Sequence, residues 1–189
     1  MAIEIEKKYR LTKRQRDAVL RRLPEIGAKL QGEEFEENTL YGGPGIELGV
    51  SVLRLRRVGG QALLTYKKRF PDSADVKRQR EDETRVDDPD AANAILDGLG
   101  YRPALIYEKR RQTWVLGRSE IAIDELPFGL FMEIEGSKKN ITSAEHKIGL
   151  KDLRTEHSTY PQLARKHGKR NGKLIEARFK NSVGKHSTR

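Results

Sequence analysis

Strict alternation of apolar and polar residues is the feature that most constrains the fold of this chain. In residues 3–10, for example, Ile3, Ile5 and Tyr9 fall on one face of an extended strand, and charged side chains fall on the other. A period of two is typical of strands that bury one face. Eight segments show this pattern between turn residues: 3–10, 34–41, 50–58, 61–69, 76–86, 105–115, 120–124 and 130–136. We therefore predict eight strands.

Helices are fewer and are predicted from the residues that begin them. The start signals are a Thr12–Gln15 capping box, an Asp88 N-cap followed by Pro89, a Thr142–Glu145 capping box, and Tyr160. Helices that follow or connect antiparallel strands indicate the α+β class. Eight strands can form a sandwich or close into a barrel, and the placement of the charges decides between these two.

Like charges recur two residues apart on the polar faces. The pairs are Glu4 with Glu6, Arg54 with Arg56, Glu81 with Glu83, Lys109 with Arg111, and Glu133 with Glu135. Like charges about 7 Å apart repel one another unless an opposite charge lies between them. Paired carboxylates suit a divalent cation, and paired bases suit phosphate oxygens. A barrel with both sets inside would bind a polyanion together with its metal. The alternative is that each charged face simply contacts water.

The net charge of +10 is concentrated at one end of the chain. Residues 164–189 hold nine Lys or Arg and one acid, so residues 1–163 are nearly neutral. We predict one domain over residues 1–163 and a basic tail over 164–189 that is flexible or partly helical. The tail offers a site for nucleic acid or polyphosphate, although a solvated, mobile segment is the simpler interpretation. The chain has no cysteine, which excludes disulfides and thiolate metal sites. Any metal would be held by carboxylates, which favours Mg²⁺ or Mn²⁺.

No apolar run approaches the length of a membrane span, and the first residues do not form a signal peptide. A cytoplasmic protein without a membrane partner is therefore expected, and the sequence leaves a homodimer open.

Several of these charged segments resemble the motifs of one known family. Glu4-x-Glu6-x-Lys8 is similar to the ExExK signature of the CYTH superfamily of triphosphate tunnel metalloenzymes, which includes class IV adenylate cyclases and thiamine triphosphatases. Further similar segments follow in the family's order over residues 3–163: Glu37–Tyr41, Leu53–Arg56, Thr65–Lys67, Arg80–Glu83, Lys109–Arg111, Asp124, Gly129–Glu135 and Ser158–Tyr160. One departure is Gln79, which stands where family members often have a base.

The resemblance implies a closed eight-stranded antiparallel β-barrel with helices outside and a triphosphate bound inside. The implied metal ligands are Glu4, Glu6, Asp124, Glu133 and Glu135, with Asp124 acting through water or in a second metal site. Glu81 and Glu83 would complete a second metal site or orient a base. The implied triphosphate-binding side chains are Lys8, Arg54, Arg56, Lys67, Lys109 and Arg111. Lys8 is also the candidate catalytic residue, either as a base that helps to activate the nucleophile or as a plain phosphate ligand.

Hydrolysis of inorganic triphosphate, a nucleoside triphosphate or thiamine triphosphate is the predicted reaction. The alternative is a class IV adenylate cyclase that makes cyclic AMP and pyrophosphate from ATP, and the charged residues do not discriminate between the two. A second alternative is a polyphosphate- or nucleic-acid-binding module. We expect Glu4→Gln to remove most of the metal-dependent rate and Glu36→Gln, taken as an outer-face change, to leave it intact.

Overall fold

The computed structural model describes residues 5–47, 49–69, 79–149 and 152–180. The chain groups into two compact units. Of the described residues, unit 1 comprises those within Glu36–Glu108 and 160–180, and unit 2 comprises those within 5–35 and Lys109–Thr159. The predicted Glu4 site residue lies outside the described ranges. None of the described helices is long and apolar enough to cross a membrane.

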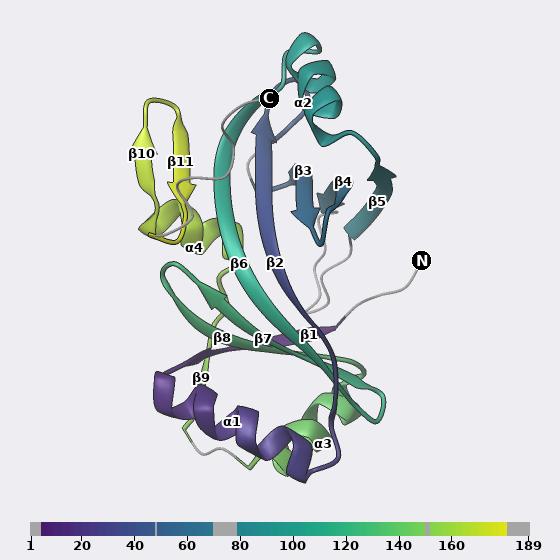
Figure 1. The fold of residues 1–189 in the computed structure, drawn as a ribbon, viewed down its shortest axis with the longest axis vertical. Helices are drawn as coiled ribbons and strands as arrows, with labels where there is room; N and C mark the ends of the chain where they lie inside the picture. Colours follow the sequence, from purple (N-terminus) through teal and green to yellow (C-terminus); the bar gives the residue numbers. More distant parts are fainter. Residues whose placement is uncertain (1–4, 48, 70–78, 150–151, 181–189) are drawn as a thin grey trace. The chain divides into compact units, whose positions relative to one another are not determined.

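Four helices and eleven strands make up the described part of the chain (Figure 1). The helices are α1 (Lys13–Glu25), α2 (Pro89–Gly98), α3 (Lys138–Ile148) and α4 (Tyr160–His167). The longer strands are β1 (Glu6–Leu11), β2 (Lys29–Gly42), β3 (Ser51–Val58), β4 (Gln61–Arg69), β5 (Gln79–Val86), β6 (Arg102–Leu116), β7 (Ser119–Leu126) and β8 (Gly129–Glu135). The short strands are β9 (Arg154–Thr155), β10 (Lys169–Asn171) and β11 (Leu174–Ala177).

The α+β class with an antiparallel sheet is confirmed, whereas the predicted closed eight-stranded barrel is not observed. The main strand order is β5-β4-β3-β2-β6-β7-β8-β1-β9, and β11 joins the sheet parallel to β6. Within the described ranges, no hydrogen-bonded ladder joins β5 to β9, so the sheet is not closed by hydrogen bonds. The sequence prediction missed β9, β10 and β11 because strands of two to four residues are too short to show a period of two.

The helix starts mostly follow the predicted capping signals. Thr12 and Gln15 form a reciprocal capping box at α1, and Asp88 caps α2 by accepting from two backbone N–H groups of its first turn. The predicted start of the third helix at Thr142 is wrong. Ser137 caps α3 instead, and Thr142 lies inside the helix, where its hydroxyl donates to a backbone carbonyl one turn earlier.

The core of unit 2 lies between one face of the sheet and the helices α1 and α3 (Figure 1). It is built from apolar side chains two residues apart on the strands and three or four apart on the helices: Tyr9, Leu11, Ile121, Ile123, Met132, Ile134, Val19, Leu23, Ile141, Ala144 and Ile148. Since these strand residues point toward the helices, the residues between them point to the opposite face of the sheet. That opposite face carries the charges.

Unit 1 has a second core between the sheet and α2. Its buried residues are Tyr41, Leu53, Leu55, Ala62 and Leu96. The Tyr41 hydroxyl donates to the Asn93 side chain of α2, which fixes the helix against β2. Here too, the alternate positions of β3 carry arginines on the face that α2 does not cover.

The C-terminal part of unit 1 packs closely against itself. Strand β11 pairs with β6 and folds back on α4. Gly168 joins α4 to β10, and a Cβ atom there would lie 2.6 Å from the Ala164 carbonyl oxygen and 2.8 Å from Ile175 Cγ2. Only glycine therefore fits at this turn. Part of the region predicted as a tail thus forms regular secondary structure.

Candidate functional site

In unit 2, the sheet face opposite α1 and α3 carries charged side chains from four strands. The register pairs Glu6 with Glu135, and Glu135 also pairs with Glu120 on its other side. The neighbouring row pairs Lys8 with Glu133. Because paired residues point to the same side of a sheet, acids from β1, β7 and β8 share this face. The sequence prediction did not single out Glu120, although it lies four residues before Asp124 and so has the same orientation.

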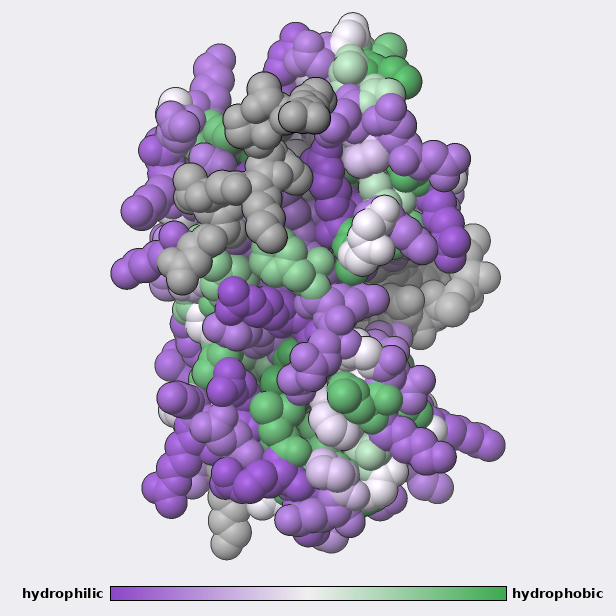
Figure 2. All heavy atoms as spheres, in the orientation of Figure 1, coloured by the Kyte–Doolittle hydropathy of each residue, from purple (hydrophilic) through white to green (hydrophobic). Residues whose placement is uncertain are grey.

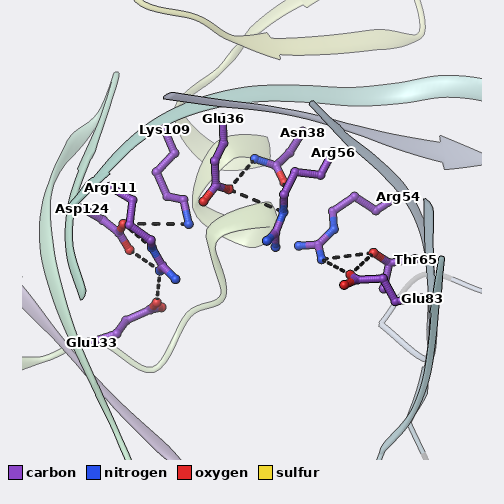
Figure 3. Close-up of polar contacts among 10 residues, drawn as sticks. All are labelled: Glu36, Asn38, Arg54, Arg56, Thr65, Glu83, Lys109, Arg111, Asp124 and Glu133. Atoms are coloured by element: carbon purple, nitrogen blue, oxygen red, sulfur yellow. Dashed lines mark hydrogen bonds and ion pairs between the residues drawn. The ribbon is translucent and has the colours of Figure 1, made fainter. Parts of the chain in front are cut away.

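Asp124 is the centre of an ion-pair network on this face (Figure 3). It is fully buried and accepts two hydrogen bonds from Arg111, from Nε at 2.8 Å and from Nη2 at 2.6 Å. The same Nη2 lies 2.5 Å from Glu133 Oε2, and Lys109 Nζ lies 3.8 Å from Asp124 Oδ1. Arg111 therefore bridges two carboxylates and fixes their separation.

Lys8 is buried beside the second of these carboxylates. Its Nζ lies 3.2 Å from Glu133 Oε1 and donates to the Ser158 carbonyl oxygen at 3.3 Å. The backbone N–H of Ser158 donates to Glu156, and this hydrogen bond lowers the pKa of Glu156. Glu156 also pairs with Arg10 on β1. These contacts hold the segment around Ser158 against the strand that carries Lys8.

The donor set of this face suits a hard divalent cation. Burial, and next the Asp124 carboxylate, raise the pKa of Glu133, although Arg111 acts in the opposite direction. A carboxyl group in this environment is stabilised as an anion when a cation is added. In the described ranges, no three acidic or histidine side chains already converge on one point. Mg²⁺ is commonly held by one or two carboxylates, with water and substrate phosphates as its other ligands. Glu133 and Asp124 fit that pattern.

Unit 1 carries a second charged face, on β2 to β5. Three of its bases each pair with an acid: Arg54 with Glu83 (3.8 Å), Arg56 with Glu36 (3.6 Å) and Lys67 with Glu81 (2.7 Å). Thr65 is fully buried between the first pair, where it donates to Glu83 at 2.7 Å and accepts from Arg54 at 3.3 Å (Figure 3). The register also places Glu81 and Glu83 on one face of β5, as the alternation predicted.

Arg54 has an unsatisfied donor on this face. Its Nε is buried and makes no hydrogen bond within the described part of the chain. Tyr107 is buried nearby, and its burial raises the pKa of its hydroxyl, although the positive charges of Arg54 and Arg56 lower it. A buried N–H group without an acceptor costs free energy, so an anion that supplies an oxygen here would be stabilised.

Glu36 and Asn38 are members of this face that the sequence analysis did not identify. Both are buried, Asn38 donates to Glu36 at 3.3 Å, and Arg56 Nε donates to Asn38 at 3.4 Å. The assignment of Glu36 to the outer face was therefore wrong. The segment before Asn38 has acids on both faces, so alternation alone could not assign it. The pairing of Asn38 with Arg56 across β2 and β3 shows that Glu36 and Asn38 lie on the basic face.

The predicted site residues thus fall into two sets. Unit 2 brings together five of them: Lys8, Lys109, Arg111, Asp124 and Glu133. The same face of the sheet carries Glu6 and Glu135. Unit 1 brings together the other five: Arg54, Arg56, Lys67, Glu81 and Glu83.

Comparison with solved structures identifies proteins that are similar in fold to this chain. The PH1012 protein of Pyrococcus horikoshii OT3 has a similar structure with a TM-score of 0.70 and 27% identity, covering 85% of this chain and 98% of that one. A candidate adenylate cyclase from Vibrio parahaemolyticus gives a TM-score of 0.68 at 23% identity, covering 85% and 97%. HpAC1 from Hippeastrum is described as a candidate adenylyl cyclase with a dominant triphosphatase activity. Its structure gives a TM-score of 0.67 at 16% identity, covering 88% of this chain and 96% of that one. No curated protein sequence matches the chain significantly.

The family profile of the CYTH domain matches residues 2–163, which is most of the chain. This match spans both charged faces and ends within α4. The chain belongs to the CYTH family.

Proposed function

We propose that this protein is a metal-dependent triphosphatase. The observation that carries the proposal is the basic face of unit 1, where Arg54 keeps a buried Nε donor without an acceptor in the described structure. Membership of the CYTH family supports a triphosphate-related enzyme activity, and members of the family are metal-dependent. A triphosphate supplies the closely spaced anionic oxygens that such a face would bind.

The two charged faces have different roles in this proposal. Arg54, Arg56 and Lys67 bind phosphate oxygens and stabilise the negative charge that grows on them during phosphoryl transfer. On the other face, Glu133 and Asp124 hold the divalent cation, with Glu6 and Glu135 as further ligands. When bound, the cation neutralises phosphate charge and makes a water molecule more acidic. Arg111 and Lys109 fix the acids and contribute positive charge.

Lys8 acts in this scheme as a phosphate-binding cation rather than as a base. Its Nζ lies 3.2 Å from Glu133 Oε1 and donates to the Ser158 carbonyl, so the side chain is positioned by oxygen acceptors of the kind that a phosphate also offers. Replacement by arginine should retain activity if binding is its role. A complete loss of kcat in Lys8→Arg, with substrate binding intact, would instead indicate the base.

The kinetic test compares two arginines that are close in sequence on β3. Arg54 lies on the basic face, and Arg57 lies on the opposite face, where it pairs with Glu37 and Asp90. Arg54→Gln should lower kcat/KM for triphosphate by about 10- to 150-fold, since a charge-assisted hydrogen bond contributes about 1.5–3 kcal/mol. Arg57→Gln should change it less than threefold. Equal losses in the two variants would refute the assignment of the faces.

Product analysis separates hydrolysis from cyclisation. The purified protein is incubated with Mg²⁺ or Mn²⁺ and with inorganic triphosphate, ATP or thiamine triphosphate. Orthophosphate as the product supports the proposal, whereas cyclic AMP with pyrophosphate from ATP would identify a cyclase. Glu133→Gln should abolish the metal-dependent rate, and Glu125→Gln, a half-exposed acid of β7 that pairs with Arg110, serves as its control.

A further inference from the structure

The C-terminal hairpin of β10 and β11 lies beyond the region that matches the CYTH domain. The family match ends at residue 163, but the structure continues through α4 into these two strands. The hairpin is part of unit 1, because Ile175–Ala177 pair with Leu105–Tyr107 of β6. The backbone of β11 is therefore held in place by its ladder with β6.

Arg178 anchors the end of the hairpin. Its Nη1 lies 2.5 Å from Glu37 and 3.1 Å from Glu108, and its Nε lies 2.9 Å from Glu176. The backbone N–H of Phe179 also donates to Glu108, at 2.7 Å. Glu108 is 2% exposed, so the C-terminal segment supplies this buried carboxylate with an ion pair and a hydrogen bond.

The acid of the hairpin is paired with Arg178 and so does not balance the exposed positive charges nearby. Glu176 is the one acid between residues 164 and 189, and it is paired with Arg178. Lys166, Lys169, Arg170 and Lys173 are exposed, and no ion pair involves them within the described part of the chain. In Figure 2 hydrophilic side chains cover much of the region that the hairpin occupies in Figure 1. Three of these cations belong to the hairpin and its turn, and Lys166 lies just before it in α4.

We propose that this hairpin binds the phosphate backbone of double-stranded DNA. Residues 166–173 contain no aliphatic side chain and no Phe, Tyr or Trp. The segment therefore lacks the aromatic platform that binding of single strands uses, and it lacks the apolar side chains that insert into a membrane surface. A two-stranded ribbon fits the major groove of B-form DNA, whereas the major groove of an RNA duplex is too narrow for side chains to enter.

The number of cations sets the expected salt dependence. Four phosphate contacts give a slope of about −3.6 in log K against log salt concentration. Affinity should therefore fall about 150-fold between 50 and 200 mM salt. Removing three of the four cations should reduce the slope to about −0.9, which is a fall of only about 3.5-fold over the same range. Because the proposal assigns all four cations to phosphates, it predicts little dependence on DNA sequence.

Fluorescence anisotropy of a labelled 20-base-pair DNA duplex, titrated with the full chain, tests the proposal. The hairpin variant is Lys169→Gln with Arg170→Gln and Lys173→Gln. The control variant removes the same charge from exposed positions of α1: Lys13→Gln with Arg14→Gln and Arg21→Gln. The hairpin variant should show the reduced slope, and the control variant should keep the slope of the parent.

Three results would overturn the proposal. Equal slopes in the two variants would mean that net charge alone drives binding. Tighter binding of a single-stranded 20-mer or of phosphatidylserine vesicles than of the duplex would mean a different partner.

Triphosphatase activity is measured in parallel, and it should be the same in the hairpin variant and the parent because none of the three residues belongs to either charged face. Failure of DNA binding with activity intact would refute this inference alone.

Discussion

Replacing Arg178 by glutamine should destabilise the fold by removing a charge partner of the buried Glu108 carboxylate. Glu108 is 2% exposed and the Arg178 side chain is 28% exposed. Breaking a buried ion pair by removing one partner costs about 3–5 kcal/mol. Partial exposure of Arg178 and the remaining hydrogen bond from Phe179 reduce this cost. We therefore expect the free energy of unfolding to fall by about 2–3 kcal/mol. For a chain of this length the corresponding fall in Tm is about 4–12 °C.

Urea denaturation followed by circular dichroism measures this loss. Arg22→Gln is the control, because Arg22 pairs with Glu25 on the surface of α1 and the two side chains are 47% and 61% exposed. Such a pair contributes at most about 1 kcal/mol. Combining Arg178→Gln with Glu108→Gln removes the buried charge and should restore part of the stability.

A loss of unfolding free energy below about 0.5 kcal/mol in Arg178→Gln would refute the role of Arg178 as a partner of a buried charge.

Three further predictions concern other parts of the chain. Gly168→Ala should lower Tm because the new methyl group would overlap the Ala164 carbonyl. Thr12→Ala should cost about 1 kcal/mol in urea denaturation, since it removes the cap of α1, whereas Thr142→Ala should cost less than about 0.5 kcal/mol. The raised pKa of Glu133 adds stability to the metal-free fold at low pH, and this stability is lost as the pH rises through that pKa. Mg²⁺ should therefore raise Tm more at pH 8 than at pH 5, and Glu133→Gln should remove that difference.

Alternation predicted the orientation of strands that have one apolar face. Met132 and Ile134 point to the core of unit 2, which leaves Glu133 on the charged face, and Leu55 likewise leaves Arg54 and Arg56 on theirs. These strands could be oriented from the sequence because a shift of one residue would bury a charge and expose an apolar side chain.

Alternation did not reveal features that depend on contacts between distant segments. The face of Glu36 is determined by the pairing of β2 with β3, since its own segment is polar on both sides. The order of the strands and the absence of a hydrogen-bonded closure are also properties of pairing. The same holds for β11, which is a strand because it pairs with β6 and β10. Local sequence contains little information about such contacts.

The ion pairs show how residues 1–163, with nearly equal numbers of acids and bases, accommodate so many charges. In unit 1 each of Arg54, Arg56 and Lys67 is paired with an acid of the same face, and in unit 2 Arg111 bridges two acids. In the proposed function, a triphosphate bound on the basic face of unit 1 reaches the unsatisfied Arg54 Nε donor and also replaces carboxylate oxygens at Arg54, Arg56 and Lys67. The displaced carboxylates would then need a new counterion, which a divalent cation would supply. On this reasoning, triphosphate without a divalent cation should bind far more weakly than the metal complex. Calorimetric titration with and without Mg²⁺ measures this difference, and equal affinities would contradict the exchange of partners.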